Sequence, residues 1–135
     1  VDQSNVDLDS ASLLPEDPDR SARTLRERIR GLTGVDAAVI ISDTFGRPWR
    51  EGLTNVAIGI AGLTPIKNYL GAQDPAGHTL QATLLAVADE LAGAAEPVMG
   101  KLNRVPATII RGLPFERGED TSKALLRDPA RDLFR

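Results

Sequence analysis

The order of helix-like and strand-like segments constrains the fold of this chain more than any other feature. A helix is expected at about 18–33, with Pro18 in its first turn and Gly34 at its end. A longer helix is expected at about 80–99, where apolar residues recur at helical spacing. The expected strands and extended segments are 37–42, 55–61, 65–70 and 105–112. They do not alternate with helices in a regular βαβ order. The pattern therefore favours an α+β fold with a mixed or antiparallel sheet.

The stretch ISDTFGRPWREG, residues 41–52, combines a strand-like start with many polar groups. We expect a buried strand to end here and a loop to occupy 43–53. Asp43 and Thr44 would then offer a carboxylate and a hydroxyl from one turn, and Asp2 would add a second carboxylate if the fold brings it close. Hard divalent cations take such oxygen ligands. The alternative interpretation is structural, with Asp2 in an Asx-turn and Asp43 capping the loop.

Basic residues in two segments are candidates for binding anions. Arg47 and Arg50 flank Trp49, and guanidinium groups bind phosphate or carboxylate in a bidentate way. The alternative is a surface pair between an arginine and Glu51, with Trp49 packed beneath it. Lys101 follows the expected end of the second helix and could reach a phosphate. Because the chain has no GxxxxGK[ST] motif, a solvated lysine is the alternative there.

Composition excludes several classes of function. The 135 residues carry a net charge of −3 and no cysteine, which excludes disulfides, thiolate nucleophiles and cysteine-bound zinc. The charge gives no general attraction to nucleic acid or anionic membranes, and neither is expected as a partner. No apolar run reaches the roughly 20 residues of a membrane span, and no signal-peptide pattern opens the sequence. We therefore expect a cytoplasmic protein.

The run ISDTFGRPWREGLTNVAIGIAGL, residues 41–63, resembles the coenzyme F420-0:γ-glutamyl ligase family. The resemblance continues in the same order through VDQSNV, YLGAQDPAGHTL, AVADELAGAAEPVMGK, VPATIIRG and LLRDPARDLFR, and it covers nearly the whole chain. It implies that 1–135 is the C-terminal portion of the ligase domain. Family members carry roughly a hundred further residues before VDQSNV. In some bacteria a reductase-like domain follows this ligase domain.

The resemblance implies a GTP-dependent ligase that joins L-glutamate to the F420 precursor through a γ-glutamyl amide, by way of an acyl phosphate. It further implies Mg²⁺ or Mn²⁺, with K⁺ as an additional candidate ion, and a homodimer. No catalytic residue is assigned. The implied metal ligands are Asp2, Asp43 and Thr44, and the implied GTP contacts are Asn5, Gly100 and Lys101. Arg47 and Arg50 remain candidate anion contacts on their chemistry alone.

A second hypothesis treats residues 1–135 as a non-catalytic structural or dimerisation piece of such a ligase, inactive without its N-terminal half. The alanine-rich helix at 80–99 and the glycine-rich segment 55–71 would then serve as packing surfaces.

Overall fold

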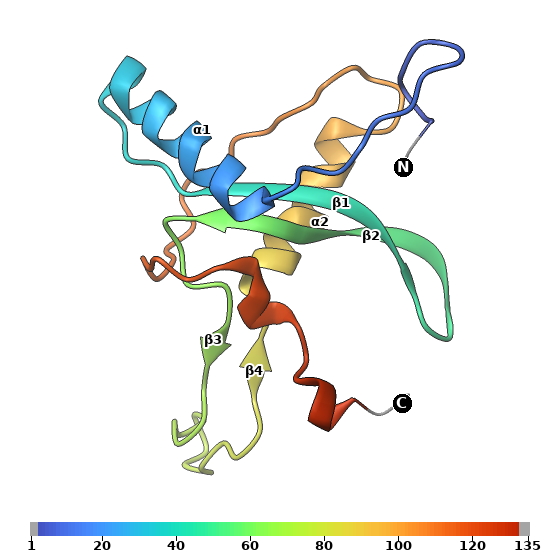
Figure 1. The fold of residues 1–135 in the computed structure, drawn as a ribbon. Coiled ribbons are helices and arrows are strands. Elements are labelled where there is room, and N and C mark those ends of the chain that lie inside the picture. Colours follow the sequence, from blue (N-terminus) through green and yellow to red (C-terminus); the bar gives the residue numbers. More distant parts are fainter. Residues whose placement is uncertain (1–2, 133–135) are drawn as a thin grey trace.

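The computed structural model describes residues 3–132, and the α+β fold is confirmed within them. Both sheets are two-stranded and antiparallel, β1 with β2 and β3 with β4 (Figure 1). No helix in this part of the chain is long and apolar enough to cross a membrane. The elements are α1 (Pro18–Thr33), β1 (Val39–Arg47), β2 (Arg50–Ala61), β3 (Lys67–Asn68), β4 (Leu84–Leu85), α2 (Val87–Met99) and the 3₁₀ turns η1 (Ser122–Leu125) and η2 (Pro129–Arg131).

Helix α1 has the bounds that its capping residues predict. The Asp17 side chain accepts a hydrogen bond from the Arg20 backbone N–H at 2.8 Å, and Pro18 follows in the first turn. At the other end Gly34 has a φ of 71°, and its N–H donates to the Arg30 carbonyl at 2.9 Å. Local sequence alone is therefore enough to define this helix.

The segment expected to be a loop, 43–53, is instead the outer half of a β-hairpin. Strand β1 continues to Arg47, β2 begins at Arg50, and Pro48 and Trp49 form the turn between them. The proline ring fixes the first turn position, and Trp49 has a φ of 57°. This half of the hairpin is exposed on both faces, so it lacks the apolar alternation that would have identified a strand.

The base of the hairpin is held by one carboxylate from the first turn of each helix. A register shift in the pairing between Ile41 and Ser42 marks a bulge opposite them in β2. The N–H of Ala57 donates to Asp89 of α2 at 2.9 Å, and the N–H of Ile60 donates to Asp19 of α1 at 2.9 Å. Two amides of β2 that would otherwise lack partners are thereby satisfied, and both helices pack against this strand.

The core is small and lies where the two helices meet the base of β2. Ile60 and Leu63 are fully buried there, and Ala88 of α2 packs with them. Gly59 allows this approach, because a Cβ at that position would collide with the Pro18 carbonyl of α1. The outer half of the hairpin extends beyond both helices (Figure 1).

Two other expectations for the fold are wrong in their bounds. The second helix begins at Val87, not near 80, because the residues before it pair with 67–72: the Leu80 N–H donates to the Ala72 carbonyl at 2.8 Å, and the Tyr69 N–H to the Thr83 carbonyl at 3.0 Å. The segment 105–112 is extended but joins no sheet. Pairing with 67–72 sets where the second helix begins, and the local pattern does not contain that pairing.

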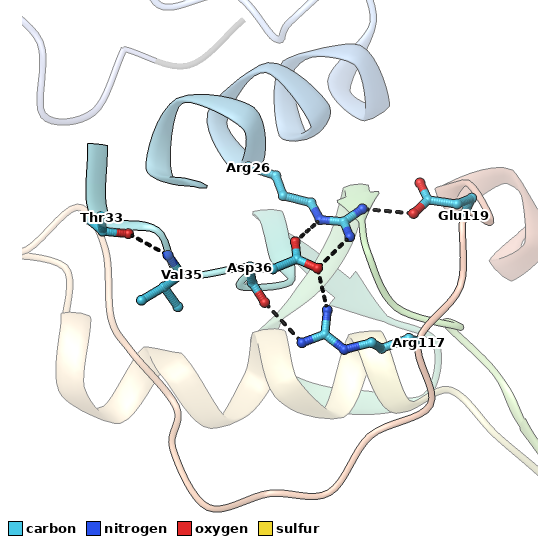
Figure 2. Close-up of polar contacts among 6 residues, drawn as sticks. All are labelled: Arg26, Thr33, Val35, Asp36, Arg117 and Glu119. Carbon is cyan, nitrogen blue, oxygen red and sulfur yellow. Dashed lines mark hydrogen bonds and ion pairs between the residues drawn. The ribbon is translucent and has the colours of Figure 1, made fainter. Parts of the chain in front are cut away.

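A charged cluster joins the C-terminal loop to α1 and to the segment between α1 and β1 (Figure 2). Arg26 donates to Asp36 at 2.9 Å and to Glu119 at 2.8 Å, and Arg117 donates to the same aspartate at 2.8 Å. The hydrogen bond from Arg26 is the largest cause of a lowered pKa at Asp36. The cluster thus joins segments that are far apart in the sequence.

Candidate metal and phosphate site

Three distant segments meet in an open pocket of about 400 Å³. The inner surface of the pocket combines carboxylate, hydroxyl and ammonium groups with leucine side chains. The lining residues are Ser12, Leu13 and Leu14 from the N-terminal segment, Asp43, Thr44 and Leu53 from the hairpin, and Lys101 from the segment after α2. Two of the three implied metal ligands therefore share a pocket with one of the implied GTP contacts.

The N-terminal segment is joined to the segment after α2 by a direct hydrogen bond. Lys101 Nζ donates to Ser4 Oγ at 2.9 Å, across 97 residues of sequence. Asn5, an implied GTP contact, is the next residue, and it is exposed with a φ of 57°. Asp2 lies outside the described residues. The hydrogen bond places Ser4, next to Asn5, beside Lys101.

Asp43 and Thr44 lie within strand β1, and this corrects the expectation that one turn presents both. Both residues still line the same pocket. Asp43 is exposed, and its Oδ1 accepts the Thr44 backbone N–H at 2.8 Å. This bond fixes the carboxylate beside the strand and leaves it further acceptor capacity.

Thr44 is connected to α2 by a relay of hydrogen bonds. Thr44 Oγ1 donates to Asn55 Oδ1 on β2 at 3.2 Å, and Asn55 Nδ2 donates to Glu96 Oε2 on α2 at 2.8 Å. Asn55 is only 6% exposed. Sequence reasoning missed Asn55 and Glu96. The sequence feature that could have pointed to them is a polar residue inside an apolar segment: Asn55 in the 55–61 strand and Glu96 in the alanine-rich helix.

Gly100 shapes the chain next to Lys101 without lining the pocket. Its N–H donates to the Glu96 carbonyl at 2.8 Å and ends α2, and its φ is 58°. A Cβ at this position would collide with the Asn103 side chain. The geometry gives Gly100 a conformational role in orienting the segment that carries Lys101.

Arg47 and Arg50 lie at the tip of the hairpin and do not line the pocket. Arg47 Nη2 donates to the backbone carbonyl of Glu51 at 2.6 Å, so it braces the turn and does not pair with the Glu51 carboxylate. Trp49 is 85% exposed. Arg47 therefore braces the turn, and the role of Arg47 and Arg50 as anion contacts stays a prediction.

Comparison with known proteins decides the family. The family model described as F420-0:Gamma-glutamyl ligase matches residues 1–112. The chain belongs to this family. Proteins named "Coenzyme F420:L-glutamate ligase" are 49% identical in Methanopyrus kandleri and 50% identical in Methanothermobacter thermautotrophicus, and the matches cover 100% of this chain and 56% and 55% of those relatives. The relative of the same name in Methanocaldococcus jannaschii is 40% identical, with 54% of its length covered. The chain thus spans a little over half the length of these relatives.

The pocket of this F420-0:γ-glutamyl ligase family member has the donor chemistry of a hard-cation and phosphate site. Asp43 supplies a carboxylate and Thr44 a hydroxyl, the oxygen ligands that Mg²⁺ and Mn²⁺ take. Lys101 lines the same pocket. Its ammonium group would repel a divalent cation, but anionic phosphate oxygens placed between the two charges would offset this repulsion. Within residues 3–132 there is no cluster of three or more His, Cys, Asp or Glu side chains that could hold a metal by itself. The donor set therefore suits a metal that shares its coordination with a bound nucleotide.

Proposed function

We propose that the protein carrying this chain is a GTP- and divalent-metal-dependent ligase that adds L-glutamate to the F420 precursor F420-0 through a γ-glutamyl amide. The observation that carries the proposal is one pocket lined by Asp43, Thr44 and Lys101 in a member of this family. The names of the relatives support a glutamate ligase. GTP, the metal and the reaction course are our proposal.

The proposed reaction has two steps. A terminal carboxylate oxygen of the precursor attacks the γ-phosphorus of GTP, the bond from phosphorus to the β–γ bridging oxygen breaks, and GDP leaves. The amino nitrogen of L-glutamate then attacks the acyl carbon, loses a proton, and phosphate leaves as the amide forms. Phosphoryl transfer of this kind depends mainly on positioning and on neutralising charge.

The residues of the pocket suit those two tasks. Asp43 and Thr44 would hold the metal, which when bound neutralises phosphate charge and orients the transferred group. Lys101, in the segment after α2, supplies a second positive charge.

The test uses the full-length gene product with F420-0, L-glutamate, GTP and Mn²⁺, followed by mass spectrometry. We expect a product heavier by one glutamyl residue, with one GDP released for each amide formed and no product after metal removal. Failure of the native protein to add glutamate under these conditions would overturn the proposed function.

A matched pair of variants tests the site separately. Asp43→Asn should lower the rate by about 10²-fold or more, the order of effect for losing one group that stabilises charge in a transition state. Asp120→Asn, at an exposed position in the C-terminal loop that does not line the pocket, should keep the native rate. Native activity in Asp43→Asn would overturn the site assignment and leave the function standing.

A further inference from the structure

The relay from Thr44 through Asn55 to Glu96 has a definite hydrogen-bond direction. The Asn55 amide Nδ2 donates to Glu96 Oε2 at 2.8 Å, so the amide NH₂ group faces the glutamate. The amide oxygen of Asn55 then faces Thr44, and an amide oxygen is also only an acceptor. Thr44 must therefore donate its only hydroxyl proton to Asn55.

This direction determines what Thr44 presents to the pocket. A hydroxyl that donates to Asn55 directs its proton into the protein and its lone pairs away from Asn55. Thr44 lines the pocket, so a hydroxyl held in this direction would offer its lone pairs, and not its proton, to a cation that contacts it there. A hydroxyl rotated to point its proton into the pocket would instead repel the cation.

The burial of Asn55 keeps the hydrogen bonds of the relay in this direction. Asn55 is 6% exposed, so a flip of its amide would leave two polar groups facing the wrong partners with little water to replace them. The end of the relay at Glu96 has a charged acceptor, and such hydrogen bonds are roughly twice as strong as neutral ones. The residues span β1, β2 and α2, so packing of the helix against the hairpin maintains the relay.

We infer that Asn55 and Glu96 are positioning residues that hold the Thr44 hydroxyl in the orientation required to bind a divalent cation. The inference rests on the proposed function, because it takes this pocket as the metal site. Neither residue touches the cation or the substrate in this account; both act through Thr44.

The test measures Mn²⁺ affinity of the full-length gene product in the presence of GDP, by electron paramagnetic resonance, so it does not depend on catalysis. Glu96→Gln should weaken Mn²⁺ binding about 10-fold, the lower end of the 10–100-fold range for partners that orient a metal ligand. The neutral amide weakens the bond to Asn55 and allows Asn55 to flip. Glu90→Gln, at an exposed position on the same helix, should bind Mn²⁺ as the native protein does.

A double-mutant cycle separates positioning from a general structural effect. Thr44→Val should weaken Mn²⁺ binding, Thr44→Ser should not, and Glu96→Gln should cause no further loss in the Thr44→Val background. An equal loss in both backgrounds, or native affinity in Glu96→Gln, would overturn the inference. If Glu96→Gln fails to fold, Glu96→Ala replaces it with the same expectation, since alanine is the best helix former. Because the readout is metal affinity, a failed inference remains distinct from a failed glutamate-addition assay.

Discussion

Asp36 is a single carboxylate whose pKa links the charged cluster to the pH dependence of stability. Arg26 lowers the pKa of Asp36 in the folded chain, chiefly through its hydrogen bond. Because the folded pKa lies below the unfolded value of about 3.9, the stabilisation is complete above the unfolded pKa and is lost as the pH falls through the folded pKa. We expect Asp36→Asn to have a lower Tm than the native chain at pH 7, and this difference to shrink as the pH falls below about 4.

Thermal unfolding of both proteins between pH 7 and pH 3 checks this expectation. Glu27→Gln, at an exposed position on α1 next to Arg26, is the control and should follow the native chain throughout. A difference between Asp36→Asn and the native chain that stays constant over the whole pH range would contradict the role given to Asp36.

At the scale of single residues, the sequence predicts three residues of the pocket but not the two residues that hold Thr44 in place. Asp43, Thr44 and Lys101 carry chemistry that motif comparison recognises, and the fold brings all three to one pocket. Asn55 and Glu96 are joined by a side-chain hydrogen bond across 41 residues of sequence, which no local spacing encodes. Such partners become visible only when the helix and the hairpin are placed together.

At the scale of elements, the approach of α1 to β2 depends on one glycine. A Cβ on Gly59 would collide with the Pro18 backbone carbonyl, which cannot move without displacing the start of the helix. We expect Gly59→Ala to lower the free energy of unfolding by about 1–3 kcal/mol, the usual cost of overpacking a core. Urea denaturation measures this change directly.

Gly31→Ala is the matched control for this prediction. Gly31 lies inside α1, and a Cβ there would meet nothing within 4 Å. Alanine is favoured over glycine inside a helix, so this variant should gain about 0.5–1 kcal/mol. If both substitutions changed stability in the same direction, the close approach at Gly59 would not be what limits the packing.

The elements differ in how far local sequence determines them. Helix α1 has capping residues at both ends, and its bounds follow from them. Helix α2 has Ala86 at its N-cap position with no side-chain cap, so its start is set by the pairing of β4 with β3 and not by a local signal. The outer hairpin has the sequence pattern of a loop because its polar residues face a pocket and solvent, and not a core.

At the scale of the whole molecule, the chain exposes much more surface than a compact protein of its mass. Its accessible surface is 10652 Å² for 14.4 kDa, whereas a compact monomer of that mass would expose about 6,800 Å². Large apolar side chains are among the exposed residues of the N-terminal segment, the hairpin and the segment after α2, including Leu13, Leu53 and Leu102.

We expect residues 1–135 expressed alone to bind a hydrophobic dye such as ANS strongly, and the full-length gene product to bind it weakly. Equal dye fluorescence per mole for the two proteins would contradict this expectation.

The small residues that the second hypothesis assigned to a dimer surface are used inside the chain. Ala88 and Ala92 of α2 are buried, and Gly59 packs against α1. A homodimer of the full-length gene product remains a prediction, and these three positions are not available to form its interface. Light scattering of the full-length gene product measures the oligomeric state.

The position of the bound metal tests the proposed site. Crystals of the full-length gene product grown with GDP and Mn²⁺ should give an anomalous scattering peak in the pocket between the hairpin and Lys101. We expect the peak about 2.0–2.6 Å from oxygen atoms of Asp43 or Thr44, the range for hard cations bound by oxygen ligands. A well-occupied Mn²⁺ peak elsewhere, with none beside Asp43 and Thr44, would contradict the account of this site.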